Sequence, residues 1–248
     1  MTAPAEPDVP GVQEALEALL ASARTARVEV VRLTDEELVV LTDDERRPAP
    51  RPWYDALPEQ AREVAQSVAL RSLAAREVVV PRPLPGGEVQ VSVPAGVQAV
   101  LTLQRRAPDV LLVQRRTATT SVSHVLQRLP DGTVIEEHVS SGGLHTLSVC
   151  PYDLAVEAVV DVVAPQGGAL LNGPERPADA ALSEGALVSS VLVGRVRDRS
   201  PVEDRCSVHA YADRVEVARA GAQAGQLVRR QVDRRGLAES VEHLLRSR

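Results

Sequence analysis

Lysine is absent from the chain, so all 28 basic residues are arginines. A Walker A phosphate loop, a Schiff-base lysine and the catalytic lysine of protein kinases each require the missing side chain. The composition therefore excludes three large enzyme classes: nucleotide hydrolases with a Walker A loop, Schiff-base enzymes and protein kinases.

Aromatic residues are almost as scarce. They make up 2% of the 248 residues, phenylalanine is absent and Trp53 is the only tryptophan. The core must therefore be built mainly from valine, leucine and alanine, which suit sheets with helices laid on one face. The length allows one large domain or two small ones, with a substantial buried core in either case.

The only cysteines are Cys150 and Cys206, which lie far apart and have no CxxC spacing. The first residues lack the charged and apolar regions of a signal peptide, and no run of about eighteen apolar residues is long enough to span a membrane. We therefore expect a cytoplasmic protein with reduced thiols and no membrane partner. The net charge of −6 argues against nucleic acid as a partner.

Changes in composition divide the chain into four segments. Residues 1–10 are expected to be a disordered lead-in, and residues 164–178 a Gly/Pro-rich connection. Residues 11–163 and 179–248 are expected to form two α+β halves, which leaves open whether they make one continuous domain.

Hydrophobic periodicity predicts the elements of the first half. "ARVEVVRL" and "EELVVLT" predict two strands around a turn at Thr34-Asp35. The clearest helix begins at Pro58, and its buried face is expected to carry four small or branched residues: Val64, Ala65, Val68 and Ala69. Further strands are predicted in "EVVVP", "GGEVQVSV", "DVLLVQRR", "SVSHVLQRLP", "GTVIEEHV" and "LHTLSVC".

The two halves show a weak internal duplication. Each contains the order strand, turn, strand, turn, strand, helix, and Asp131 corresponds to Asp213 as Leu154 does to Leu237, roughly eighty residues apart in both cases. We therefore predict an α+β fold with a pseudo-twofold repeat of an antiparallel β-meander plus a helix, the helices flanking the sheet.

The stretch "IEEHVSSGGLHTLSVC" concentrates acids, histidines and a cysteine. If residues 140–143 form a hairpin loop, His138 lies opposite His145 with Cβ atoms about 5 Å apart. Glu136 then shares their face and Glu137 does not, so two histidines and one acid are available to a zinc ion. The spacing matches no known metal motif, and we interpret the stretch as a polar hairpin end without metal or other cofactor.

No other residues indicate catalysis. Ser123 and His124 alternate onto opposite faces of a strand, and no GxSxG sequence surrounds the serine. Free cysteines are usually small buried hydrophobic residues. We therefore predict a protein without catalytic residues, which is not an enzyme.

Trp53 and Tyr54, in a proline-rich loop, are the residues best suited to bind a partner, because aromatic anchors dominate interfaces. The alternative is that they cap the core beneath the loop. A second hypothesis is a DNA-binding regulator that uses the winged-helix-like segment 57–93, in which Arg71 and Arg76 would contact DNA.

The blocks "RLTDEELVVL", "LPEQAREVAQSVALRSLAARE" and "PDGTVIEEHVSSGGLHTLSV" resemble the EspG-type chaperones of actinobacterial type VII (ESX) secretion. The resemblance covers about four-fifths of the chain, and this sequence departs from the family at its Pro-rich beginning and at residues 164–178. It implies a pseudo-twofold α+β fold and a cytosolic, non-enzymatic chaperone whose client is a PPE-like helical secretion substrate. It assigns no binding residues, and the sequence does not indicate an oligomeric state.

Overall fold

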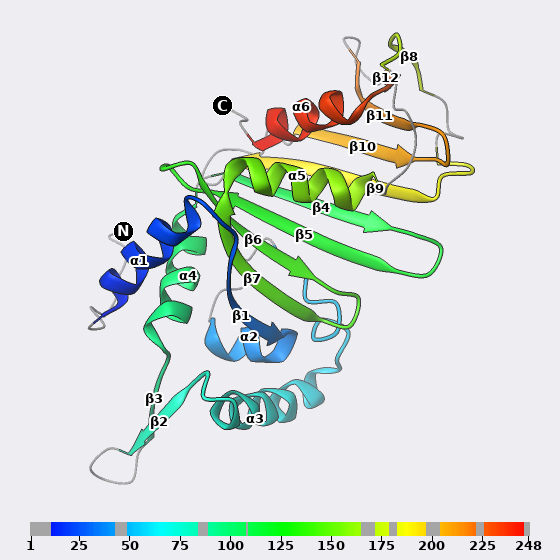
Figure 1. Ribbon diagram of the computed structural model, residues 1–248. Coiled ribbons are helices and arrows are strands. Elements are labelled where there is room, and N and C mark those ends of the chain that lie inside the picture. Colours follow the sequence, from blue (N-terminus) through cyan, green and yellow to red (C-terminus); the bar gives the residue numbers. More distant parts are fainter. Residues whose placement is uncertain are drawn as a thin grey trace, which may run out of the picture.

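A computed structural model of the chain describes residues 11–42, 49–83, 89–107, 109–164, 172–178, 183–196, 204–221 and 226–245. Its main feature is one broad antiparallel sheet of ten strands, in the order β1-β7-β6-β5-β4-β9-β10-β11-β12-β8 (Figure 1). A separate hairpin, β2-β3, forms a second sheet of two strands.

The bounds of the elements are as follows. The helices are α1 (Val12–Ala23), α2 (Asp35–Leu41), α3 (Glu59–Ala75), α4 (Ala95–Arg106), α5 (Tyr152–Val163) and α6 (Arg234–Leu245). The strands are β1 (Val28–Thr34), β2 (Val80–Pro83), β3 (Val89–Ser92), β4 (Asp109–Arg116), β5 (Ser121–Arg128), β6 (Thr133–Val139), β7 (Leu144–Pro151), β8 (Arg176–Pro177), β9 (Val188–Val196), β10 (Asp204–Ala210), β11 (Val215–Ala220) and β12 (Leu227–Gln231).

The centre of the sheet is the antiparallel pair β4 and β9, and the strand order is mirrored about it. On one side β5, β6 and β7 follow outward and lead into α5, and on the other β10, β11 and β12 lead into α6. Both helices lie on the same face of the sheet and contact each other (Figure 1). The predicted α+β fold with flanking helices and a pseudo-twofold repeat is confirmed, and the pair β4-β9 joins the two halves in one sheet.

Each face of the sheet has its own core. Valines and leucines of α5 and α6, including Val159, Val160 and Leu237, pack onto the strands of both halves. On the other face, Val100 and Leu103 of α4 and the apolar side of α1 cover β1, β6 and β7. Each fully buried side chain of this size stabilises the fold by about 1.5–3 kcal/mol. None of the described helices is long and apolar enough to cross a membrane.

The second of the two strands predicted around Thr34-Asp35 is wrong, because residues 35–41 form α2. Thr34 and Glu37 make a capping box: the Glu37 amide donates to Thr34 Oγ1 at 3.4 Å, and the Thr34 amide donates to Glu37 Oε2 at 3.0 Å. This satisfies two of the free amide groups at the start of the helix, and the acids of the first turn favour the positive end of the helix dipole.

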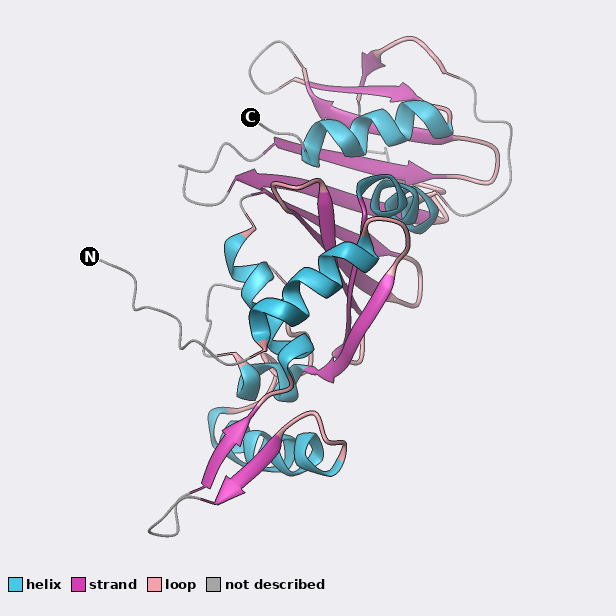
Figure 2. Ribbon diagram, turned by 60° about the vertical axis from the view of Figure 1, so that its left-hand side comes forward, coloured by secondary structure: helices cyan, strands magenta, loops and turns pink. Residues whose placement is uncertain are grey.

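The predicted buried face of α3 is also largely wrong. Val64 is 64% exposed and Val68 is 48% exposed, whereas the residues that are buried are Ala69 and Leu73. The reason is the position of the helix: α3 packs against α2, at the end of the molecule that also carries the β2-β3 hairpin, and not on the large sheet (Figure 2). Because α2 is short, it covers only a narrow stripe of α3. This stripe contains Ala69 and Leu73, which lie four residues apart on one side of the helix.

Both edges of the large sheet are irregular. The pairing of β1 with β7 shifts between Glu29 and Val31, and β8 at the opposite edge contains only two residues, of which Pro177 has no amide hydrogen. The strands predicted from Asp109 to Cys150 are confirmed, as are those of the second half.

The capping box gives a first testable prediction. We expect Thr34→Ala to lower the free energy of unfolding by about 1 kcal/mol, because it removes the acceptor at the start of α2. Thr119→Ala, in the exposed turn between β4 and β5, should change it by less than about 0.5 kcal/mol. Urea denaturation of both variants measures the difference, and equal effects would contradict the role of the cap.

Candidate functional site

A buried histidine joins the sheet to α2. The ring of His145 on β7 lies between two carboxylates: Nε2 is 2.6 Å from Asp35 Oδ1, and Nδ1 is 2.8 Å from Glu137 Oε1. All three side chains are at most 1% exposed. Gln104 of α4 donates a further hydrogen bond to Glu137 Oε2 at 2.9 Å.

The backbone supports this arrangement. In the register of β6 and β7, Val139 pairs with His145 and Glu137 pairs with Leu147, so the histidine and the glutamate share one face. The Asp35 amide donates to the carbonyl of Gly143 at 2.8 Å, which fixes the first residue of α2 against the β6-β7 turn.

The second carboxylate oxygen of Asp35 holds the loop that carries Trp53 and Tyr54, which we call the aromatic loop. Asp35 Oδ2 accepts hydrogen bonds from the backbone amides of Trp53 and Tyr54, at 2.7 and 2.9 Å. The two residues that the sequence indicates as partner-binding are therefore fixed through Asp35 to His145 and the sheet. We call Asp35, Glu137 and His145 the anchor triad.

Burial alone lowers the pKa of His145, but hydrogen bonds to Asp35 and Glu137, together with the charges of these two carboxylates, raise the pKa above its ordinary value. When it is protonated, the imidazole donates from both nitrogens, one to each carboxylate. Neither nitrogen remains for a substrate or a metal ion.

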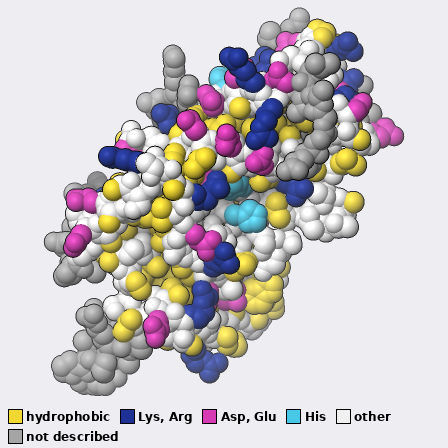
Figure 3. Space-filling model, in the orientation of Figure 1, with side chains coloured by type: hydrophobic (Ala, Val, Ile, Leu, Met, Phe, Trp, Pro, Cys, Tyr) yellow, Lys and Arg dark blue, Asp and Glu magenta, His cyan; other side chains and the backbone are white. Residues whose placement is uncertain are grey.

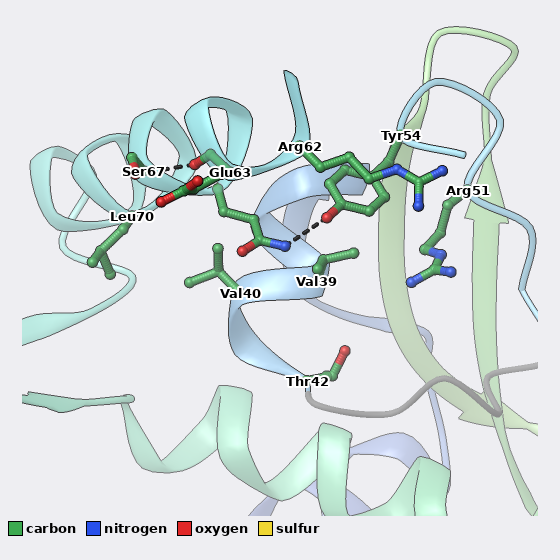
Figure 4. A pocket seen from close by; sticks show the side chains of 10 residues that line it. Val39, Val40, Thr42, Arg51, Tyr54, Arg62, Glu63, Ser67 and Leu70 are labelled. Atoms are coloured by element: carbon green, nitrogen blue, oxygen red, sulfur yellow. Dashed lines mark hydrogen bonds between the residues drawn. The ribbon is translucent and has the colours of Figure 1, made fainter. Parts of the chain in front are cut away.

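The aromatic loop borders a groove between α2 and α3. Its volume is about 620 Å³, and its walls are formed by α2, the loop and α3. Val39, Val40 and Leu70 point into the space between the two helices (Figure 4). Glu37 holds α2 and α3 together, because its carboxylate accepts from Ser72 Oγ at 2.7 Å and pairs with Arg76 at 2.8 Å.

The two predicted binding residues have different surroundings. Tyr54 is 5% exposed, and its hydroxyl accepts from Gln66 Nε2 at 2.5 Å. The guanidinium groups of Arg51 and Arg62 each lie 5.6 Å from the centre of its ring. Trp53 is 44% exposed. Tyr54 thus forms a fixed wall of the groove, as in the capping alternative, and Trp53 is partly exposed next to it in the sequence.

The predicted pairing of His138 with His145 is wrong by one residue. His138 pairs with Thr146, so the two histidines lie on opposite faces of the sheet and cannot share a metal ion. Within the described ranges no group of three or more His, Cys, Asp or Glu side chains is arranged to hold a metal.

The face that carries His138 has its own polar cluster. Glu136 pairs with Arg27 at 2.6 Å and lies 3.8 Å from His124 Nε2. Burial lowers the pKa of His124 to about 4, against the opposing effect of Glu136. Ser123 is on the other face from His124, as the alternation predicted.

The cysteines and the winged-helix-like segment complete the candidates. Cys150 and Cys206 are both buried free thiols, and burial, aided by Glu136, raises the pKa of Cys150 to about 12. Segment 57–93 does place a helix before a hairpin, but Arg76 is already bound to Glu37 and to the carbonyl of Arg32 at 2.6 Å.

The sequence patterns did not indicate Asp35 as a site residue, nor the apolar lining residues Val39, Val40 and Leu70. The capping-box pattern Thr34-x-x-Glu37 was the available signal for α2. Its recognition would have placed Asp35 at a helix start and Val39 and Val40 on one helix.

The raised pKa of His145 predicts how stability depends on pH. Since the folded pKa lies above the ordinary value of about 6.5, this stabilisation is complete below pH 6.5 and is lost as the pH rises through the folded pKa. We expect the free energy of unfolding of the native chain to fall as the pH rises above about 6.5, and this fall to be clearly smaller in His145→Gln.

Urea denaturation across this range measures both slopes. The pKa values of His124, His138 and His209 are lowered, so these histidines change the free energy of unfolding only below about pH 6.5. They do not add to the slope measured above that pH. A native slope no steeper than that of the variant would contradict the charged triad. Removing one partner of a buried ionic group costs about 3–5 kcal/mol, so the comparison uses slopes and not absolute stabilities.

Gly143 gives a sharper test of the contact with Asp35. Gly143 and Gly132 both have positive φ angles, of 73° and 88°, but a Cβ on Gly143 would lie 2.7 Å from Asp35 Oδ2, whereas one on Gly132 meets nothing within 4 Å. We expect Gly132→Ala to cost about 1–2 kcal/mol of backbone strain. Gly143→Ala should cost clearly more and change the fluorescence of Trp53, and equal costs would contradict the contact.

Comparison with models of known protein families and with curated proteins finds no match to this chain. No family is therefore shown for it, and the resemblance to EspG-type chaperones remains an interpretation of the sequence blocks. The functional argument consequently depends on the geometry of the groove and the anchor triad.

Proposed function

We propose that the protein is a non-enzymatic cytoplasmic binding protein, an EspG-like chaperone or adaptor that holds a helical segment of a client in the α2–α3 groove. The observation that carries the proposal is a groove of mixed apolar and polar lining beside the loop that carries Trp53 and Tyr54, whose backbone a buried charge network fixes in place.

The groove has the chemistry of a helix-binding site. Val39, Val40 and Leu70 form the apolar part of a lining that also contains polar and charged side chains, and Leu70 remains 38% exposed. A volume of about 620 Å³ is in the usual range of binding clefts. Amphipathic helices bind such grooves through apolar residues at i, i+3, i+4 and i+7.

The polar rim indicates which charge the client carries. Arg51 and Arg62 flank Tyr54, and Arg51 also pairs with Asp55 at 3.1 Å. Arg62 Nε is buried and has no hydrogen-bond partner within the part of the chain that the structure describes. An acidic group beside the apolar stripe of the client helix would pair with the guanidinium groups of Arg51 and Arg62.

Rigidity supports binding. Loops that order only upon binding lose conformational entropy at that moment. Here the backbone of Trp53 and Tyr54 is held by Asp35, and α2 and α3 are joined through Glu37. The site is therefore organised before a client arrives. The occupied nitrogens of His145 also favour a structural role over catalysis.

The pseudo-twofold sheet with flanking helices agrees with the fold that the EspG resemblance implies. Within this proposal the client is a PPE-like helical secretion substrate, which exposes an apolar helical surface before export. The chaperone would cover that surface and prevent its aggregation.

The experiment compares two leucine variants. Tagged native protein, Leu70→Asp and Leu227→Asp are incubated with native cytosol of the source cells, and bound proteins are identified by mass spectrometry. Leu227 is the matched control, since it is a 55% exposed leucine on β12, away from the groove. We expect one helical client with the native protein and the control, and a loss of at least about tenfold with Leu70→Asp, since hot-spot residues contribute 2 kcal/mol or more.

The purified client then tests the activity itself. A stoichiometric complex should suppress client aggregation in light scattering and shift the emission of Trp53, the single tryptophan. The proposal fails if no helical client is held, or if Leu70→Asp and Leu227→Asp bind it equally well.

A further inference from the structure

A second cavity lies between α6 and strands β10 to β12, at the opposite end of the molecule from the α2–α3 groove (Figure 1). Its volume is about 130 Å³, and its lining includes the thiol of Cys206 and one face of α6 around Ser240. Figure 3 shows arginine and acidic side chains gathered over this end of the molecule. The proposed client binding does not use this cavity.

Arginines from three adjacent strands line the cavity: Arg205 of β10, Arg219 of β11 and Arg230 of β12. The register places Arg219 and Arg230 on one face of the sheet, because Arg219 pairs with Cys206, and Arg230 pairs with Val217, the next residue but one along β11. Arg205 precedes Cys206 and alternates onto the other face of β10. Neighbours on the same face of adjacent strands have Cβ atoms about 5–8 Å apart.

Both acids that line the cavity, Glu175 and Glu239, already have partners. Glu175 is paired with Arg219 at 3.2 Å, and Glu239 is paired with Arg235 at 3.1 Å. Arg230 has no ion pair within the described ranges. The pair Arg219–Glu175 is about half exposed on both sides, and exposed pairs are weak. Arg219 can therefore turn to another anion, next to the uncompensated charge of Arg230.

The size of the cavity limits the ligand. About 130 Å³ corresponds to about four water molecules in the liquid, well below the 300–1,000 Å³ of clefts for drug-sized molecules. Guanidinium groups bind carboxylate and phosphate oxygens through two parallel hydrogen bonds. We propose that this cavity binds a small oxyanion, a phosphate or carboxylate group, between Arg219 and Arg230.

Cys206 provides a direct readout, because it lines the cavity and is 7% exposed, whereas Cys150 is fully buried under α5. The full chain is treated with iodoacetamide, which is uncharged, and the labelling of each cysteine is followed by mass spectrometry. Inorganic phosphate should slow the labelling of Cys206 saturably, by about tenfold at about ten times its Kd. Acetate and phosphoserine are the comparison anions. Tighter binding of phosphate identifies a free ion, and tighter binding of phosphoserine identifies a group on a larger molecule.

Two adjacent arginines of β12 give a matched pair of variants. Arg230→Gln should raise the Kd for phosphate at least about tenfold, because charge-assisted hydrogen bonds are the strong ones. Arg229 lies on the other face of the strand, paired with Glu216 at 3.2 Å, so Arg229→Gln removes the same charge without changing the cavity and should alter the Kd less than about twofold. Arg219→Gln is the second cavity variant.

Cys150 should remain unlabelled in every variant that folds. Labelling of Cys150 therefore identifies a variant that has unfolded, as opposed to one that has lost only the anion site. The inference is overturned if none of the three anions protects Cys206, or if chloride at equal ionic strength protects it equally. It is also overturned if Arg229→Gln weakens protection as much as Arg230→Gln, because the effect would then be general charge attraction.

Discussion

The contact of His145 with Asp35 and Glu137 is the interaction on which the arrangement of the first half depends. It joins the β6-β7 hairpin, the start of α2 and the backbone of the aromatic loop in one buried hydrogen-bonded group. Buried ionic groups rarely add much net stability, because the charges must leave water. Their value here is geometric: few other arrangements of α2 and the loop satisfy both carboxylates. The position of Trp53 is therefore set by the sheet, although the residue itself lies on a loop.

The two faces of the sheet are used differently. α5 and α6 cover one face across both halves and pack on apolar residues of the strands of both halves. The other face of the first half carries α4 and α1, together with the anchor triad. This division explains why "IEEHV" contains charges at adjacent positions. Glu136 and Glu137 point to opposite faces, and each meets its own cationic partner, Arg27 or His145.

The repeat of meander and helix was predictable, because alternation and turn residues are local signals and both halves carry them. α2 was not predictable from its hydrophobic pattern, because a short apolar run such as "LVVL" fits a strand or a helix equally well. Only the capping box at Thr34 and Glu37 distinguishes the helix from a strand. The predicted buried face of α3 was wrong because burial depends on the element that packs against the helix, which the sequence does not reveal. The predicted cross-strand pair of His138 and His145 was wrong because a shift of one residue in the register moves every side chain to the other face of the sheet. The contact of Asp35 with His145 joins residues 110 positions apart, and no local pattern indicates it.

The irregular edges of the sheet restrict how any other protein can attach. A regular edge offers a row of free amides and carbonyls to which an extended chain can add as a further strand. The shift in β1 interrupts that row on one side, and on the other β8 is only two residues long and includes Pro177. Neither edge is a template for an extended segment or for a second copy of this sheet. Under the proposed function, the client is therefore not bound by pairing of backbones, and recognition is left to side chains on the surface.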